Sequence, residues 1–293
     1  MKRLFVGLLC MTLSAAALAD GVDAARKRAV GSMLVTGHIE VLSSGNVGRY
    51  DIDESSKLPS AIVQLIGKTV PQWQFEPVVE DGKPVTEKSK MSLRVAANPV
   101  ADGKYAISII GAEFSPEVAK SGTSFTTDQI SEKSIPQPLY PHDLVQEHVA
   151  GTVYVLLRVD RTGNVVDASA QQVNLRVAAS EREMIPYRKM LALAATSALK
   201  HWTFNIPTTG KEADRDYWIA RVPVNFNIAG DRIPGYGEWD VYIPGPLEPA
   251  PWINTLPTIT DDKLLIGNVD ATPAGGSLLS AGGLHLITKI SGT

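Results

Sequence analysis

A succession of strand, turn, strand and helix signals between residues 151 and 228 constrains the fold most. Residues 151–160 are rich in β-branched and aromatic side chains, which favour a strand. Residues 161–164 have turn chemistry, because Gly163 can adopt a positive φ at no steric cost. A returning strand follows over residues 165–175, so this stretch predicts a β-hairpin.

A helix and a third strand complete the unit. Ser180 and Glu183 have capping-box spacing, and Pro186 either kinks the helix or marks its true first turn. The apolar helix face consists of Leu191, Ala195, Ala198, Leu199 and Trp202. Residues 217–228 alternate apolar and polar side chains, which predicts the third strand. In this small β-β-α-β unit, we expect the helix to cover only one face of the sheet.

An earlier stretch repeats the pattern and suggests an internal duplication. The matching segments are a strand at 37–41, a turn at 44–46, a return strand from Val47, a helix face of Leu58, Ile62, Leu65 and Ile66, and a closing strand at 91–95. Trp73-Gln74-Phe75 matches Trp202-Thr203-Phe204, and residues 105–114 resemble a further strand. We therefore predict an α+β fold with two small β-β-α-β modules, each a three-stranded antiparallel sheet with a helix on one face.

The N-terminus has the order of a secretory signal peptide. Met1-Lys2-Arg3 is positively charged, residues 4–18 are apolar, and Ala17-Leu18-Ala19 is a small-residue cleavage pattern. We expect residues 1–19 to be removed during export to the periplasm of a Gram-negative cell envelope, with no stable membrane insertion afterwards. An uncleaved anchor is the alternative, although the apolar run is shorter than the roughly 20 residues of a membrane span.

The composition argues against several classes of protein. The single cysteine, Cys10, lies in the signal segment, so the mature chain has no disulfide and no thiol nucleophile. Lys and Arg total 28, Asp and Glu total 31, and the net charge is -3. A nucleic-acid-binding protein would show a basic stripe, which this sequence lacks. We therefore expect no nucleic-acid partner.

These patterns divide the chain into six segments. They are a signal peptide (1–19), an N-terminal lead (20–35), a first, degenerate module (36–114), a linker (115–134), a second module (135–228) and a Pro- and Gly-rich tail (229–293). The lead is expected to hold a short helix over residues 23–30. The Pro and Gly density of the tail predicts irregular chain.

Short motifs follow one another along the second module. Pro138-Leu139-Tyr140-Pro141 precedes it, and Ala-Gly-Thr-Val at 150–153 opens its first strand. A strand, turn and strand follow at 159–165, a helix end at 194–204, and a Val-Pro-Val-x-Phe strand at 222–226. In combination these motifs resemble the C-terminal domain of the TonB family, over about a third of the chain. The first module resembles that family more distantly, mainly through residues 73–77.

The resemblance implies a sheet edge that binds a short extended segment of an outer-membrane receptor. Binding of this kind is strand addition, in which an open edge offers its main-chain N–H and C=O groups to a peptide. We expect the third strand to be the receiving edge, and envelope proteins such as TonB-dependent outer-membrane receptors to be the partners in TonB-dependent transport. The predicted contact residues are Tyr217, Ile219, Arg221, Val222, Val224, Asn225 and Asn227.

The chain departs from the energy-transducing members of that family. Those members keep an N-terminal membrane helix and a long Pro-rich spacer, whereas this chain has a cleavable signal and a short linker. We therefore expect the binding mode without the energy-transducing role. The alternative hypothesis is a structural or oligomeric scaffold protein of the envelope, in which the sheet edges pair with one another.

The sequence carries no pattern typical of a catalytic or metal site. Its five histidines form no H-E-x-x-H or similar ligand set, and no G-x-S-x-G nucleophile motif occurs. Asp51, Asp53 and Glu54 are interpreted as a solvated loop. We therefore expect a protein that is not an enzyme and that has no cofactor and no metal. The motif residues with a structural role are predicted to be Tyr140, Pro141, Gly151, Gly163, Trp202, Phe204, Trp73 and Phe75.

Overall fold

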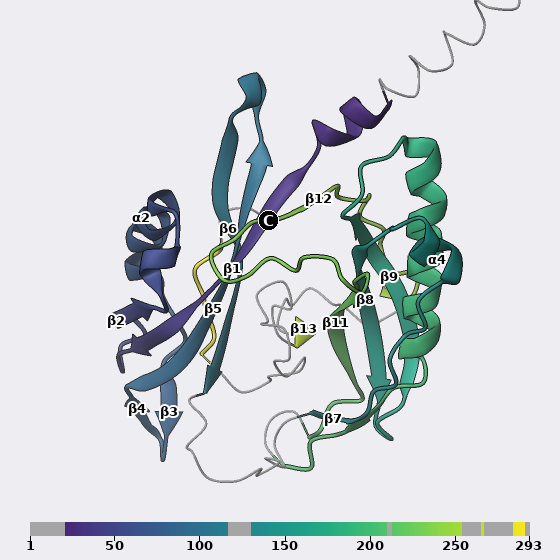
Figure 1. Ribbon diagram of the computed structural model, residues 1–293. Coiled ribbons are helices and arrows are strands. Elements are labelled where there is room, and N and C mark those ends of the chain that lie inside the picture. The colour runs from purple at the N-terminus through teal and green to yellow at the C-terminus, as the bar shows by residue number, and fades with distance from the viewer. Residues whose placement is uncertain (1–20, 117–129, 210–212, 254–264, 267–283, 291–293) are drawn as a thin grey trace, which may run out of the picture.

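The protein has an α+β fold, as predicted, built from two main β-sheets with helices on their outer sides (Figure 1), together with the two-stranded pairs β3-β4 and β7-β10. The structure is a computed structural model, and it describes residues 21–116, 130–209, 213–253, 265–266 and 284–290. The faces of the two sheets that the helices leave uncovered lie toward each other. The predicted signal peptide and most of the predicted linker lie outside the described residues. None of the described helices is long and apolar enough to cross a membrane.

The first sheet has the strand order β12-β1-β5-β6, with β2 also paired to β1. Its strands are β1 (Val30–Val41), β2 (Val47–Ile52), β5 (Glu87–Pro99), β6 (Tyr105–Pro116) and β12 (Asp240–Tyr242). Residues 21–26 are helical, but β1 begins at Val30, so the expected N-terminal lead is too long. The strand extends this far because Met33 and Val35 continue its alternation and are fully buried.

Helix α2 (Ser60–Thr69) covers the outer face of the first sheet. Ile62 and Ile66 lie one turn apart and are fully buried in the core of this half. The rings of Trp73 and Phe75 pack edge-on against Phe114 of β6, at centroid distances of 5.9 and 5.0 Å. The remaining short elements are η1 (Ser55–Lys57), η2 (Val70–Gln72), β3 (Val78–Glu80), β4 (Lys83–Val85) and η3 (Ala101–Gly103).

The second sheet has the strand order β13-β11-β8-β9. Its strands are β8 (Gly151–Asp160), β9 (Val165–Leu175), β11 (Tyr217–Phe226) and β13 (Leu265–Ile266). Strand β8 lies in the middle, because it forms the predicted hairpin with β9 and pairs antiparallel with β11. Three short elements flank this sheet: β7 (Ser131–Ser134), α3 (His142–Gln146) and β10 (Thr203–Asn205). Since β6 continues to Pro116 and β7 pairs with β10, the linker is shorter than predicted.

Helix α4 (Glu181–Leu199) covers the outer face of the second sheet (Figure 1). Ser180 caps it, and the Glu183 carboxylate accepts a hydrogen bond from the Ser180 amide at 3.0 Å. Pro186 lies inside the helix and does not mark its first turn. The buried residues of the helix are Met184, Arg188, Leu191, Ala195 and Leu199.

The hairpin turns of the two halves share one geometry. Gly45 and Gly163 have φ angles of 83° and 82°. Phe75 donates its amide to the Gly45 carbonyl, Phe204 donates to the Gly163 carbonyl, and both distances are 2.8 Å. A Cβ atom would lie 2.3 Å from the Phe75 carbonyl oxygen at position 45 and 2.1 Å from that of Phe204 at position 163. Both turns therefore require glycine, because the φ angle is positive and because a Cβ atom would collide with a main-chain carbonyl oxygen.

Most of the described residues beyond 229 are irregular, as predicted, but short pieces of this tail pair with both sheets. Strand β12 pairs with β1, Ile243 pairs with Leu175 of β9, and β13 pairs with β11. Leu286 also bridges to Phe75 in the first half. The tail is ordered there because open sheet edges offer partners to its main chain, whatever its proline content. Both sheets consequently have strands beyond the three that were expected.

Candidate functional site

The candidate site is the outer edge of β11 together with the space beside it. Strand β8 occupies the inner edge of β11 along its whole length. Val222 and Val224 point into the α4 core and are 1% and 7% exposed, so their side chains cannot contact a partner as predicted. Ile219 and the half-buried Tyr217 point to the opposite face, where Ala250 of the tail covers them. The second sheet is therefore covered on both faces here, contrary to the expectation of one open face.

The predicted contact residues at the end of β11 take part in local hydrogen bonds. Asn225 accepts a hydrogen bond from the Thr152 hydroxyl of β8 at 2.8 Å. Asn227 lies past the end of the strand and accepts from the guanidinium group of Arg176. Arg176 also binds Asp240 of β12 through two contacts of 3.0 and 3.1 Å. Asn227 thus belongs to a network that joins the two sheets, and not to the receiving edge.

The chain's own tail already occupies part of the outer edge of β11. Leu265 and Ile266 of β13 lie parallel to β11, opposite Ile219 and Ala220. The expectation of an edge open along its whole length is therefore wrong at these two positions. From Arg221 to Phe226, none of the strands that the structure describes pairs with this edge. The described part of the tail thus covers only the beginning of this edge.

Pro223 indicates which main-chain groups face outward. Proline has no N–H to donate, so it is tolerated in a strand where its nitrogen faces away from the ladder. Pro223 lies opposite Tyr154 of β8 within an unbroken pairing register. Main-chain groups alternate in direction along a strand. We infer that Arg221 and Asn225, two residues either side of Pro223, turn their N–H and C=O groups toward the outer edge.

The Pro-x-Tyr-Pro lead holds the far end of this edge. The Tyr140 hydroxyl donates to the Val149 carbonyl at 2.6 Å, and its ring packs edge-on against Phe226 at 5.2 Å. Burial, with a smaller contribution from the negative charge of Asp231, raises the pKa of Tyr140. Pro141 precedes α3 as its N-cap residue.

The remaining motif residues have contacts within the second half. Trp202 donates its indole N–H to the Pro136 carbonyl at 2.9 Å, and Phe204 is buried beside it with a centroid distance of 6.3 Å. At Gly151, a Cβ atom would lie 2.5 Å from the Asn174 carbonyl oxygen, so β8 and β9 approach closely there. These contacts fix the position of β11 relative to the lead and the hairpin.

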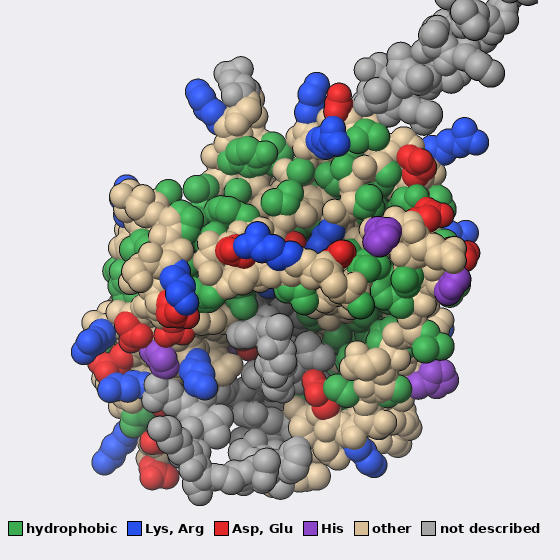
Figure 2. Space-filling view, viewed as in Figure 1, with side chains coloured by type: hydrophobic (Ala, Val, Ile, Leu, Met, Phe, Trp, Pro, Cys, Tyr) green, Lys and Arg blue, Asp and Glu red, His purple; other side chains and the backbone are tan. Residues whose placement is uncertain are grey.

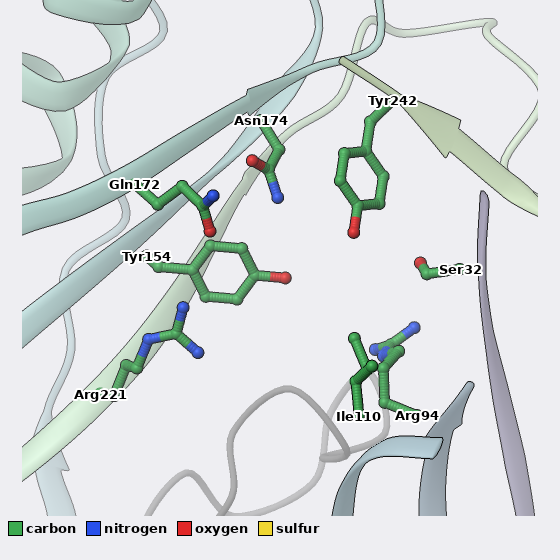
Figure 3. A pocket seen from close by; sticks show the side chains of 8 residues that line it. All are labelled: Ser32, Arg94, Ile110, Tyr154, Gln172, Asn174, Arg221 and Tyr242. Carbon is green, nitrogen blue, oxygen red and sulfur yellow. The ribbon is translucent and has the colours of Figure 1, made fainter. Parts of the chain in front are cut away.

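A polar pocket lies beside β11, between the two sheets (Figure 3). Its volume is about 70 Å³. The side chains come from strands of both sheets: Ser32, Arg94, Ile110, Tyr154, Gln172, Asn174, Arg221 and Tyr242. The guanidinium carbon of Arg221 lies 4.2 Å from the centre of the Tyr154 ring, in a cation–π contact. Arg221, which was predicted as an edge residue, therefore belongs to both the edge and the pocket.

Hydrogen-bond donors are directed into this pocket. The Asn174 side-chain oxygen accepts from the Gly245 amide at 3.3 Å, so its NH₂ group turns inward, as Figure 3 shows. Asn174 is only 5% exposed. The hydroxyl groups of Tyr154 and Tyr242 also point into the space between the sheets (Figure 3). Sequence reasoning missed this pocket, because its residues look like ordinary outward positions of separate strands.

One group of potential metal ligands occurs among the described residues, at the β1–β2 hairpin. The Nδ1 atom of His38 lies 3.2 Å from Asp51 and 3.9 Å from Asp53, and the possible ligand atoms lie within 4.8 Å of one another. Thr36 donates a hydrogen bond to Asp53 at 2.6 Å. These half-exposed groups form an ion pair when His38 is protonated. The sequence signal was the hairpin itself, which places His38 opposite Asp51.

Comparisons with protein-family models, curated proteins and solved structures find no match to this chain. The resemblance to the TonB C-terminal domain stays a prediction that depends on the sequence motifs. Figure 2 shows basic and acidic side chains interspersed on the face in view.

Proposed function

We propose that this protein binds an extended segment of another cell-envelope protein by strand addition on the outer edge of β11. The observation that carries the proposal is the parallel pairing of β13 with Ile219 and Ala220. An edge that pairs with a segment of its own chain has the geometry to pair with a segment of another. The partner would extend along β11 from Arg221 toward Phe226, in competition with β13.

Two sequence features support this proposal. The motifs of the second module resemble a family that binds outer-membrane receptors by such an edge, and the N-terminal segment has the order of an export signal. The proposal therefore places the protein in the periplasm, with receptors of TonB-dependent transport among the candidate partners. The protein recovered from cells is then expected to begin at Asp20, which N-terminal sequencing would test.

A second candidate function is a structural scaffold of the envelope. It is favoured by the tail, which pairs through β12 with the first sheet and through β13 with the second. A chain that covers its own edges in this way gains rigidity and avoids edge-to-edge association. If the protein is a scaffold, no added peptide should shift the amide resonances of β11. Its mass in solution should exceed that of one chain if it assembles through other surfaces.

The test is a titration of the isotope-labelled mature chain with synthetic peptides from the periplasmic segments of outer-membrane receptors. We expect the amide resonances of Arg221 and Asn225 to shift, because these groups face the outer edge. A matched peptide, N-methylated at alternate residues on one edge, keeps its side chains but loses main-chain donors, and should not bind. Equal binding of the N-methylated peptide, or shifts confined to residues away from β11, would contradict strand addition.

Competition with β13 is tested by replacing Leu265 and Ile266 with proline. Proline cannot donate to the ladder, so the tail should leave the edge more often. Each lost hydrogen bond is worth roughly 0.5–1.5 kcal/mol, so peptide affinity is expected to rise about twofold to tenfold per bond. An unchanged affinity would mean that β13 does not compete with the ligand.

A further inference from the structure

Residues 284–290 of the tail pair with residues 74–76 of the first half in the manner of an added strand. Leu286 forms an antiparallel bridge with Phe75. Two main-chain hydrogen bonds flank this bridge at 2.8 and 2.9 Å, and they run from Ile287 to Gln74 and from Glu76 to His285. The segment is therefore held largely by main-chain groups, as a peptide bound by strand addition is.

The side chains of this segment alternate between the core and the solvent. Leu284 is 6% exposed and belongs to the core of the first half, and Leu286 and Ile290 are partly buried against the same core. Ile287, between them, is 58% exposed. Successive side chains of a strand point to opposite faces. The first half thus completes its core with apolar side chains from a segment far downstream in the sequence.

The second half receives the matching strand from a different part of the chain. Strand β10, which contains Phe204, pairs antiparallel with β7. Ile130, directly before β7, is 2% exposed in the core of the second half. Phe75 and Phe204 hold equivalent positions, because each donates its amide to the glycine of a hairpin turn. Residues 284–290 therefore take the place in the first half that β7 takes in the second.

The residues ahead of the first half pack elsewhere. Residues 21–26 are helical, and Ala25 is fully buried in the core of the second half. Arg28 forms an ion pair with Glu181 of α4 at 2.7 Å. None of the described residues ahead of β1 fills the position beside Phe75. The first half consequently depends on residues 284–290 to cover this part of its core.

The contacts of residues 284–290 are the same whichever copy of the chain supplies them. An element that keeps its contacts when it moves to a second copy is exchanged at low cost. Residues 267–283 separate the segment from Ile266 of β13, and seventeen residues span at most about 60 Å. A folded chain of this size is roughly 50 Å across. The segment can therefore reach the equivalent position on a neighbouring copy.

We propose that two copies of this chain associate by exchanging residues 284–290, each copy placing its segment beside Phe75 of the other. The pair is closed, because each copy gives one segment and receives one. A tethered segment competes for its own site at an effective concentration on the order of millimolar. The exchanged pair is therefore expected to become abundant as the protein approaches that concentration. This association uses the first half and is separate from binding at the edge of β11.

The first measurement is the mass of the full mature chain in solution, by analytical ultracentrifugation from about 10 µM to about 1 mM. We expect a dimer at the upper concentrations. Leu286→Asp puts a charge against the core and should abolish the dimer. The matched control, Ile287→Asp, changes the exposed neighbour and should keep it. A monomer throughout, or a dimer that survives Leu286→Asp, would overturn the exchange.

The second measurement shows which copy supplies the segment. One batch of the chain is labelled with ¹³C and another with ¹⁵N, and the two are mixed at the concentration where the dimer forms. We expect nuclear Overhauser contacts between the Leu286 methyl groups of one copy and the Phe75 ring of the other. A dimer in which this contact occurs only within one copy assembles through another surface, and the proposal then fails.

A synthetic peptide of residues 284–290 tests the receiving position itself. Added to the Leu286→Asp chain, it should shift the amide resonances of Gln74 and Glu76. A peptide carrying Leu286→Asp should bind at least about tenfold more weakly, and one carrying Ile287→Asp within about twofold of the parent peptide. If circular dichroism shows the Leu286→Asp chain to be unfolded, Leu286→Ala takes its place. A folded variant that binds no peptide would refute a separable segment.

Discussion

Replacing Gly163 with alanine tests the packing of the second hairpin turn most directly. Gly163 has a φ of 82°, and an added Cβ would lie 2.1 Å from the Phe204 carbonyl oxygen. Left-handed backbone costs an alanine roughly 1–2 kcal/mol. Relieving the contact also breaks the hydrogen bond from Phe204 to Gly163, worth about 1 kcal/mol, and displaces a buried ring at a cost of roughly 1–3 kcal/mol. The expected loss of unfolding free energy is therefore about 3–6 kcal/mol.

The matched control is Gly82→Ala in the turn between β3 and β4. Gly82 has a φ of 76°, but an added Cβ there meets no atom within 4 Å. It should lose only the roughly 1–2 kcal/mol of left-handed backbone. Gly45→Ala should resemble Gly163→Ala, because its added Cβ would lie 2.3 Å from the Phe75 carbonyl oxygen.

Urea unfolding followed by tryptophan fluorescence measures these differences. With a dependence on urea of roughly 2–3 kcal/mol per molar, the Gly163→Ala midpoint should fall by about 1–3 M. The Gly82→Ala midpoint should fall by less than about 1 M. Equal shifts for Gly82→Ala and Gly163→Ala would refute the argument, because the two positions share the backbone cost and differ only in the close contact.

Two further predictions concern the ends and contacts of α4. Hydrogen bonds from Arg28, and then from Arg188, hold the pKa of Glu181 below its ordinary value of 4.5. These contacts therefore stabilise the folded state at pH values above 4.5. The stabilisation is lost as the pH falls through the lowered pKa of Glu181 in the folded protein. The difference in urea midpoint between the parent protein and Glu181→Gln should therefore shrink between neutral and strongly acidic pH. A hydrogen bond to the Glu147 carboxylate raises the pKa of Tyr187 to about 12. In Glu147→Gln, phenolate absorbance should appear at lower pH than in the parent protein, and an unchanged titration would contradict this assignment.

The local elements could be predicted because their signals are local. Ser180 and Glu183 are three residues apart, and both capping contacts form within one turn of α4. Gly163 marks its turn by its own conformational freedom. The helix face of α4 follows a period of 3.6 residues, so Leu191 and Ala195 were found as buried residues from spacing alone.

The tail and the pocket could not be predicted because they depend on distant partners. Leu265 and Ile266 become a strand only because β11, far earlier in the chain, offers an edge. Alternation in the closing strands placed Arg94 and Arg221 away from the helix cores, but it could not show that the two sheets face each other. Every polar side chain on an uncovered sheet face looks solvated until the opposing layer is known.

The pairing of β13 with β11 has a consequence for the proposed binding of a foreign segment. Under the proposed function, main-chain hydrogen bonds along β11 would contribute to the binding of any extended peptide, and the chain's own β13 already uses two residues of that edge. A foreign peptide would therefore have to exceed the tail in binding free energy, and none of the described strands pairs with the outer edge from Arg221 to Phe226.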